Sequence, residues 1–199
     1  MYYSSSNWIH YSAVTSTSPT YNKFQYNLTP SNACATVSAA TSLLYFVQIP
    51  NVKIVSISRF DRVEDWDVFY YDLIKKRYCF GELKMREGCY VNKKEQAIEK
   101  KKIKSAREYW RKYEIECNVF YFFHESLRFA KACLTELSEE DLNSFELRNK
   151  KRNISPINGC EHTPNIIYTI PAERMDWSDV ENVITNEQAR TFLNSMYKK

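Results

Sequence analysis

Three charged residues in the segment 65–88, DWDVFYYDLIKKRYCFGELKMREG, have the types and spacing that phosphodiester chemistry uses. The segment has the pattern of two strands around a turn at IKKR. Because side chains alternate across a strand, Glu82 and Lys84 share one face of YCFGELKM. Asp67 begins the strand before the turn, and pairing across the turn brings it near Glu82. The pattern therefore predicts two carboxylates and one ammonium group on the same sheet face.

Two carboxylates from adjacent strands form a hard oxygen site of the kind that Mg²⁺ or Mn²⁺ prefers. A lysine beside them can position or deprotonate a water molecule and can balance charge on a reacting phosphate. The structural alternative is a surface salt bridge, worth about 0 to 1 kcal/mol. A covered carboxylate pair is costly without a cation, however, so a sheet covered on both faces favours the metal site.

Other chemistries find little support in the composition. The chain has only three glycines, which excludes Gly-rich nucleotide loops. Its six cysteines and three histidines show no zinc-binding spacing. No Ser/His/Asp or Cys/His pair has the setting of a nucleophilic site. We therefore expect reduced, buried thiols that act as small apolar side chains.

The elements that would position this site predict an α/β fold. A helix is expected from residue 31, with Ser31 or Asn32 as its cap and Pro50 after its end. Strands are expected over 51–60, 67–72 and 78–85, followed by a Lys/Glu-rich helix over 93–112. The apolar run CNVFYFF, residues 117–123, is typical of a central strand covered on both faces.

The two flanks are less regular. Residues 1–30 predict an irregular leader, and residues 125–199 predict a mainly helical extension packed on the same domain. In that extension ESLRFAKACLTEL, SEEDLNSFELRNKK and TNEQARTFLNSMY have helical patterns, and NIIYTI has that of a strand.

Asp67 and the Glu82-Leu83-Lys84 motif lie in a helix-strand-strand-strand-helix-strand run over residues 31–124. This arrangement resembles the core of the PD-(D/E)XK nuclease superfamily, which includes restriction endonucleases and many phage and repair nucleases. The resemblance implies a restriction endonuclease-like core with a mixed central sheet flanked by helices. It implies a Mg²⁺-dependent hydrolase, an endonuclease or exonuclease acting on DNA, and a homodimer as one way to cut both strands.

The resemblance also implies roles for individual residues. Asp67 and Glu82 would be metal ligands together with the backbone carbonyl of Leu83, and Lys84 would be the catalytic lysine. The helix that follows would supply a polar residue facing the site. Gln96 is the first candidate, with Lys93, Lys94 or Lys100 as substitutes.

The sequence departs from the family pattern at two points. Trp66 precedes Asp67 where the motif that names the family has proline, and no carboxylate precedes Asp61, although many members carry one in the first helix. Glu64 or Asp65 could compensate, or the site could bind one metal. This absence motivates a second hypothesis: a non-catalytic nucleic-acid-binding or assembly protein, such as a viral structural protein, that retains a nuclease-like fold.

Charge is segregated along the chain, which favours a polyanionic partner. Residues 91–112 contain nine Lys or Arg against three Glu. A basic helix can grip a phosphate backbone, although such helices are often only solvated faces. Glu99, in a second Glu-x-Lys motif, is expected on such a face, and Trp110 is expected in the core. The expected nucleic-acid-binding residues are Lys93, Lys94, Lys100, Lys101, Lys104 and Arg107.

The sequence contains no apolar run of the roughly 18 residues that a membrane span requires. Its start lacks the basic and apolar regions of a secretory signal. We therefore expect an intracellular, soluble protein without a membrane partner. A small, Gly-poor chain with a nuclease core also fits a phage or mobile-element origin, which would place it in the host cytoplasm.

Overall fold

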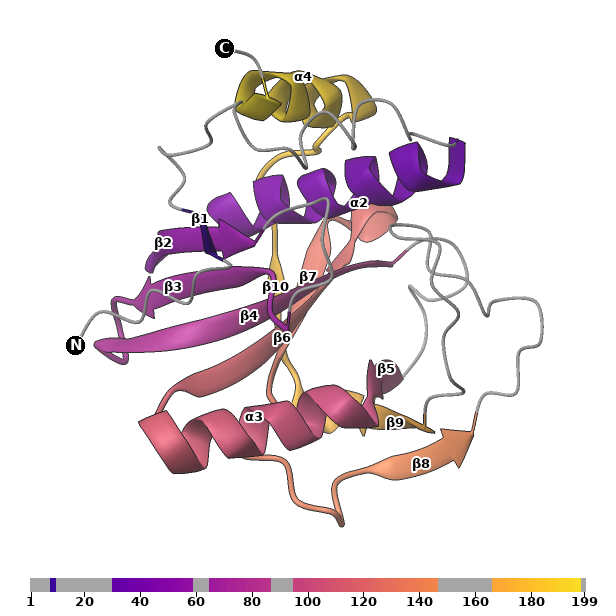
Figure 1. Cartoon of the computed structure of the whole chain (residues 1–199). Helices are drawn as coiled ribbons and strands as arrows, with labels where there is room; N and C mark the ends of the chain where they lie inside the picture. The colour runs from indigo at the N-terminus through magenta and orange to yellow at the C-terminus, as the bar shows by residue number, and fades with distance from the viewer. Residues whose placement is uncertain (1–7, 10–29, 59–64, 87–94, 147–165, 198–199) are drawn as a thin grey trace.

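The computed structural model describes residues 8–9, 30–58, 65–86, 95–146 and 166–197 (Figure 1). These residues form an α/β structure with a mixed central sheet and three α-helices. Along the chain the helices and strands are β1 (Trp8–Ile9), α2 (Pro30–Val47), β2 (Val52–Ser58), β3 (Val68–Asp72), β4 (Arg77–Arg86), β5 (Glu95–Glu99), α3 (Lys100–Tyr113), β6 (Glu116–Phe123), β7 (Arg128–Cys133), β8 (Asn143–Glu146), β9 (Ile166–Pro171), β10 (Asp176–Asp179) and α4 (Asn186–Tyr197).

The central sheet has the strand order β1-β2-β3-β4-β6-β7-β10, in which β1 contributes only two residues. Strands β4 and β6 are parallel, and every other neighbouring pair in this sheet is antiparallel. A parallel pair needs a crossover connection, which β5 and α3 provide here. A second, three-stranded sheet has the order β5-β9-β8.

Helices cover both faces of the central sheet (Figure 1). On one face Leu43 and Phe46 of α2 pack with Tyr70 and Phe120, and α4 lies against α2. On the other face Ile103 of α3 packs in a separate cluster. All eight residues of β6 are buried, which confirms the predicted central strand. The predicted first helix, the next strand and the 67–85 hairpin are also confirmed.

The basic helix predicted over 93–112 begins later than expected. Residues 95–99, EQAIE, form strand β5, and α3 begins at Lys100. Gln96 and Ile98 are buried and alternate with more exposed neighbours, which is the periodicity of a strand. Pairing with β9 satisfies the backbone of this segment and outweighs its helix propensity. Residues 93 and 94 lie outside the described residues.

The prediction of a mainly helical extension after residue 124 is wrong. ESLRFAKACLTEL contains strand β7, and SEEDLNSFELRNKK contains strand β8. β7 pairs with the buried strand β6, and β8 pairs with β9, so tertiary pairing overrides local propensity in both segments. The strand predicted at NIIYTI and the final helix are confirmed. Of the 1–30 leader, the structure describes only β1 and Pro30.

Two other expectations concern the environment of the protein. Among the described residues, no helix combines the length and apolarity needed to cross a membrane. Cys79, Cys117 and Cys133 are free thiols, and the first two are buried, as predicted. The side chains of the other three cysteines lie outside the described part of the chain.

Candidate metal and active site

The β3–β4 hairpin brings Asp67 beside Glu82. The paired register of the hairpin ends with Val68 opposite Gly81, and the Asp67 N–H also donates to the Gly81 carbonyl, at 2.9 Å, so the pairing is irregular at Asp67. The Leu83 N–H donates to Asp67 Oδ2 at 2.7 Å. The N–H and C=O of a strand residue point to the same edge, so the Leu83 carbonyl also faces the Asp67 side of β4.

Glu82 lies at the centre of a buried ionic cluster, and 7% of the residue is exposed. Its Oε1 accepts a hydrogen bond from Lys84 Nζ at 2.9 Å, and its Oε2 accepts one from Lys102 Nζ at 2.7 Å. Lys102 Nζ also donates to the Asp65 carbonyl. Lys84 Nζ lies 3.4 Å from Glu99 Oε2. Lys102 and Lys84 also act on Asp67 through their charge, so three carboxylates, those of Asp67, Glu82 and Glu99, lie near two ammonium groups.

The electrostatic environment shifts the pKa values of the two central carboxylates, Asp67 and Glu82, in opposite directions. Burial, followed by the negative charge of Glu82, raises the pKa of Asp67 to about 7, despite the opposing effect of Lys102 and Lys84. Burial also acts to raise the pKa of Glu82, but Lys84 and Lys102 outweigh it and the pKa is lowered. For Lys84, burial opposes the charged form, but Glu82 and Glu99 prevail and its pKa is raised. Glu82 and Lys84 are therefore charged at neutral pH.

The donor set fits a hard divalent cation. It offers two carboxylates and a strand carbonyl, and the raised pKa of Asp67 reflects its burial and, after that, the charge of Glu82, both of which a further cation would offset. In the described part of the chain, only Glu116, Cys133 and Glu136 form a group of three potential ligands, with ligand atoms within 4.8 Å of one another. Asp67, Glu82 and Glu99 do not form such a group, so the Asp67 site offers a pair of carboxylate ligands, an arrangement suited to Mg²⁺, which keeps several water ligands.

Trp66, the residue before Asp67, lies on the apolar side of the site. It is fully buried and stacks on Phe80 with ring centroids 6.1 Å apart. Lys102 Nζ lies 5.3 Å from its ring centroid, within the range of a cation–π contact. Trp66 therefore helps to exclude water from the ionic cluster and contributes to the position of Lys102.

Gln96 does not occupy the helical position that was predicted. It lies on β5 and is buried, and its Oε1 accepts a hydrogen bond from Arg86 Nε at 3.1 Å. The Arg86 guanidinium lies over the Tyr121 ring at 4.9 Å. Arg86 shares the β4 face of Glu82 and Lys84, because alternate residues of a strand point to one side. Gln96 therefore contacts this face of β4 through Arg86, and it does so from strand β5 and not from a helix.

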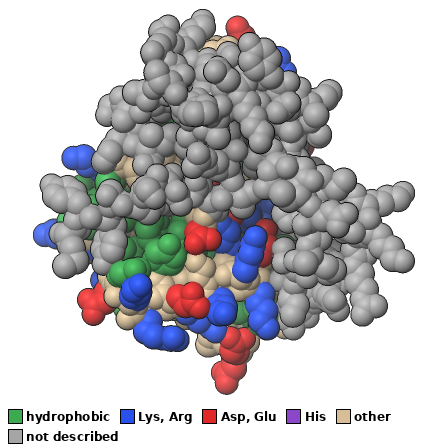
Figure 2. Space-filling model, in the orientation of Figure 1, with side chains coloured by type: hydrophobic (Ala, Val, Ile, Leu, Met, Phe, Trp, Pro, Cys, Tyr) green, Lys and Arg blue, Asp and Glu red, His purple; other side chains and the backbone are tan. Residues whose placement is uncertain are grey.

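The predicted nucleic-acid-binding residues fall into three groups. Lys100, Lys101 and Lys104 are all exposed on α3, and Figure 2 shows Lys and Arg side chains, mixed with acidic ones, over the part of the surface where α3 lies. Arg107 is bound instead to the Glu139 carboxylate and, at 2.9 Å, to the Leu137 carbonyl. Lys93 and Lys94 lie outside the described residues.

Trp110 is 41% exposed, so its expected place in the core is wrong. The side chain lies on the same helix as the exposed lysines of α3. Aromatic side chains in such settings can stack on bases.

Two functional candidates were missed by the sequence reasoning. Lys102 is buried, and the signal that could have revealed it is its position in the otherwise apolar or aromatic stripe of Ile98, Ala106 and Tyr109. Glu99 was expected on a solvated face, but its carboxylate contacts Lys84. It supplies the third carboxylate of the cluster from the start of α3, whereas α2 packs on the opposite face of the sheet.

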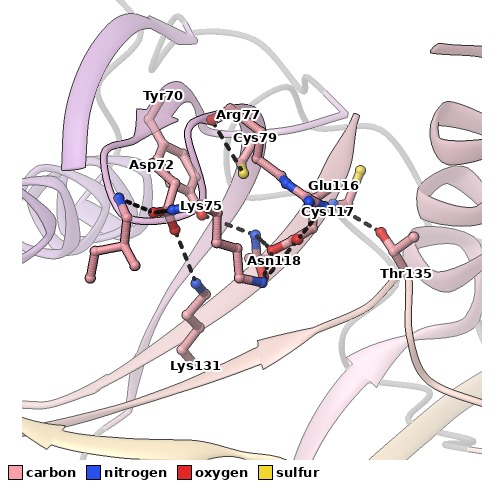
Figure 3. A network of polar contacts seen from close by, with 11 residues as sticks. Tyr70, Asp72, Lys75, Arg77, Cys79, Glu116, Cys117, Asn118, Lys131 and Thr135 are labelled. Carbon is pink, nitrogen blue, oxygen red and sulfur yellow. Dashed lines mark hydrogen bonds and ion pairs between the residues drawn. The ribbon is translucent and has the colours of Figure 1, made fainter. Parts of the chain in front are cut away.

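A second polar cluster, centred on Glu116, lies on the face of the sheet opposite Glu82 (Figure 3). Lys75 Nζ donates to both Glu116 oxygens at 2.8 and 2.9 Å, and Arg77 lies 3.4 Å from one of them. Asp72 Oδ1 accepts from the backbone N–H groups of Ile74 and Lys75 at 2.9 and 2.8 Å. These contacts hold the turn of the β3–β4 hairpin.

The geometry of the Asp67 site thus combines a carboxylate pair, a charged lysine and a local excess of negative charge. Such a site can bind a hard cation next to a phosphate ester. Comparisons of the chain with protein-family models, with curated proteins and with solved structures find no match.

Proposed function

We propose that the chain is a metal-dependent nuclease of the PD-(D/E)XK type that hydrolyses phosphodiester bonds, with DNA as the expected substrate. The observation that carries the proposal is the position of the Asp67 carboxylate, which accepts the Leu83 N–H and interacts electrostatically with Glu82, whose Oε1 accepts a hydrogen bond from Lys84. The order α2, β2, β3, β4, α3, β6 supports a restriction endonuclease-like core, with β5 as an additional strand before α3.

Asp67, Glu82 and the Leu83 carbonyl would hold Mg²⁺ or Mn²⁺. When bound, such an ion supplies Lewis-acid stabilisation of the charge that develops on the scissile phosphate. Leu83 orients Asp67 through its N–H, so the carboxylate needs little reorganisation to act as a ligand. Ionisation of Asp67 is required for binding, and its pKa of about 7 makes this available at neutral and higher pH.

Lys84 acts in this proposal as a fixed cation. Its raised pKa and its contacts with Glu82 and Glu99 keep the ammonium group protonated, which disfavours a role as a general base. A charged ammonium group beside the metal ligands can orient the attacking water and balance negative charge on the phosphate. Lys100, Lys101 and Lys104 of α3 would contact the nucleic-acid backbone next to it.

Plasmid and linear DNA, incubated with the protein and Mg²⁺ or Mn²⁺, test this function. We expect metal-dependent cleavage that Glu82→Ala and Lys84→Ala abolish and that Glu108→Ala, a change on the solvent side of α3, leaves intact. Cleavage that persists in Glu82→Ala, or that survives chelation of divalent ions, would refute the assignment.

A second candidate is a non-catalytic nucleic-acid-binding or assembly protein with a nuclease-like fold. The observation that favours it is that lysines bind both oxygens of Glu82, as in a purely structural ion-pair network. It predicts salt-dependent DNA binding without metal-dependent cleavage. Micromolar Mn²⁺ binding that requires Asp67 and Glu82 would decide against it.

A further inference from the structure

Lys102 places an ammonium group where oxygen atoms converge as they do around a metal ion. Its Nζ lies 2.7 Å from Glu82 Oε2 and donates to the Asp65 carbonyl, two residues before Asp67. Carboxylate and carbonyl oxygens are the ligands of Mg²⁺ and Mn²⁺. The ammonium group therefore occupies an oxygen of Glu82, a carboxylate that the proposed metal ion would also bind.

Lys102 lies on the inner side of α3, where its side chain is only 10% exposed. A buried ammonium group is unfavourable unless anions and hydrogen bonds compensate for lost hydration. Glu82 supplies the charge, the Asp65 carbonyl supplies a hydrogen bond, and the Trp66 ring lies 5.3 Å away. The position of Lys102 therefore depends on the carboxylates of the site.

The two lysines of the cluster are held unequally. Lys84 contacts two carboxylates, those of Glu82 and Glu99, whereas Lys102 contacts one carboxylate and one neutral carbonyl. Losing Glu82 as a partner would leave Lys84 with Glu99. If Lys102 loses Glu82, its long aliphatic side chain can carry the ammonium group from its buried position towards water. Lys102 is thus the easier of the two cations to displace.

We propose that Lys102 and a divalent cation compete for Glu82, so that Lys102 is a built-in placeholder that must leave before the metal binds fully. This inference rests on the proposed metal-dependent function. An ammonium group and a divalent ion on the same carboxylate repel one another strongly in a partly buried site. Lys102 therefore lowers the affinity for the metal, and it stabilises the carboxylates when no metal is bound.

Mn²⁺ binding to the full chain tests the competition. Calorimetric titration would compare the wild type with Lys102→Met and with the matched control Lys104→Met, which removes an exposed lysine from the same helix. We expect Lys102→Met to bind Mn²⁺ at least about tenfold more tightly and Lys104→Met to bind it like the wild type. In thermal unfolding, Lys102→Met should have a lower midpoint without Mn²⁺ and a larger rise on its addition.

A measurement on the wild type covers the case in which Lys102→Met fails to fold. Acetylation of amines followed by peptide mass spectrometry would compare Lys102 with Lys104, with and without Mn²⁺. We expect labelling of Lys102 to increase when Mn²⁺ binds and labelling of Lys104 to remain constant. Constant labelling of Lys102 in the presence of bound Mn²⁺ overturns the proposal.

The outcomes separate this inference from the proposed function. If Mn²⁺ binds the wild type and binding requires Asp67 and Glu82, but Lys102→Met has equal or weaker affinity, only the placeholder role is overturned. If Mn²⁺ binds neither protein, or binds without a need for Asp67 and Glu82, the metal site itself is refuted and the placeholder role falls with it.

Discussion

Two buried glutamates on opposite faces of one sheet, Glu82 and Glu116, are both held by lysines but differ in the balance of charge around them. Lys75, Arg77 and Asn118 surround Glu116. Burial opposes its charge, but the hydrogen bonds from Lys75 and Asn118 and the charges of Lys75 and Lys131 prevail and lower the pKa of Glu116.

Around Glu82, two further carboxylates join two lysines, and the pKa of Asp67 rises to about 7 because of burial and Glu82. A buried carboxylate whose charge is balanced by neighbouring cations has a structural role. Where buried carboxylates outnumber the cations, a bound metal ion would stabilise the remaining negative charge. The Glu116 cluster brings its own cations and orders a hairpin turn. The Glu82 cluster has fewer cations than carboxylates, so we expect a metal ion to bind at Asp67 and Glu82.

The largest expected effect is on stability, at the cluster with matched charges. Glu116→Ala removes the hydrogen bonds that Glu116 accepts from Lys75 and Asn118, and we expect a loss of about 3 kcal/mol in the free energy of unfolding, because Lys75 and Arg77 are 38% and 45% exposed and can turn to water. Urea denaturation would measure it. Mn²⁺ affinity should be unchanged in the folded variant, and a strong loss of affinity would break the distinction between the two clusters.

The next effect concerns where the metal binds. We expect Asp67→Ala to weaken Mn²⁺ binding at least about 100-fold, which corresponds to about 2.8 kcal/mol. Cys133→Ala and Glu136→Ala should leave the affinity unchanged, although these residues belong to the only three-donor group in the described part of the chain. Calorimetry on the three variants measures this, and the reverse pattern would assign the metal to the Glu116 cluster.

The pH dependence of stability sharpens the comparison further. Asp67 has a pKa of about 7 in the folded chain and 3.8 as its ordinary value. Between these values the folded protein binds more protons than the unfolded one, so the contribution of Asp67 to stability falls as pH rises. Asp67→Asn removes this decline. We expect the free energy of unfolding of the variant, relative to that of the wild type, to rise by at least about 1.4 kcal/mol from pH 4 to pH 8.

Urea unfolding of both proteins across that pH range, without divalent ions, gives the difference directly. The amide oxygen that Asp67→Asn introduces can still accept the Leu83 N–H, so the variant keeps the local hydrogen bond. If the free energies of unfolding of the two proteins change with pH in parallel, the pKa of Asp67 is not raised in the folded chain.

The smallest effect is expected on the surface of α3. Lys104→Ala should weaken DNA binding by about 1 kcal/mol or less and reduce the slope of log affinity against log salt by about 0.9. Fluorescence anisotropy at several salt concentrations would measure both. Arg107→Ala serves as the contrast, because its contacts with Glu139 and Leu137 predict a loss of stability rather than of salt dependence.

Local patterns were sufficient for the parts of the fold that carry the carboxylate pair. Alternation in YCFGELKM placed Glu82 and Lys84 on one face, and the hairpin turn brings the start of β3 beside this strand, where the Asp67 carboxylate accepts the Leu83 N–H. The continuous apolar run of β6 likewise indicated a strand covered on both sides. These features depend on neighbours close in sequence, which is why pattern reasoning found them.

Other features depended on partners that are distant in sequence. EQAIE and the segment that contains β7 carry residues compatible with helices, yet each becomes a strand because a neighbouring strand offers hydrogen bonds. Gln96 consequently lies on β5 instead of a helix. The helical stripe of α3 indicates that Lys102 points inward, but its contact with Glu82, and that of Glu99 with Lys84, depends on where α3 packs, which no local pattern specifies.

The sequence by itself thus determined which residue types could bind a hard cation and which of them share a strand face, because strand periodicity is a local property. Only the tertiary structure decided the charge balance of that face. Two lysines, one of them on a helix twenty residues from Glu82, compensate Glu82 but leave Asp67 with a raised pKa. Charge balance is a sum over all groups in contact, and those contacts exist only after the sheet and α3 have packed together.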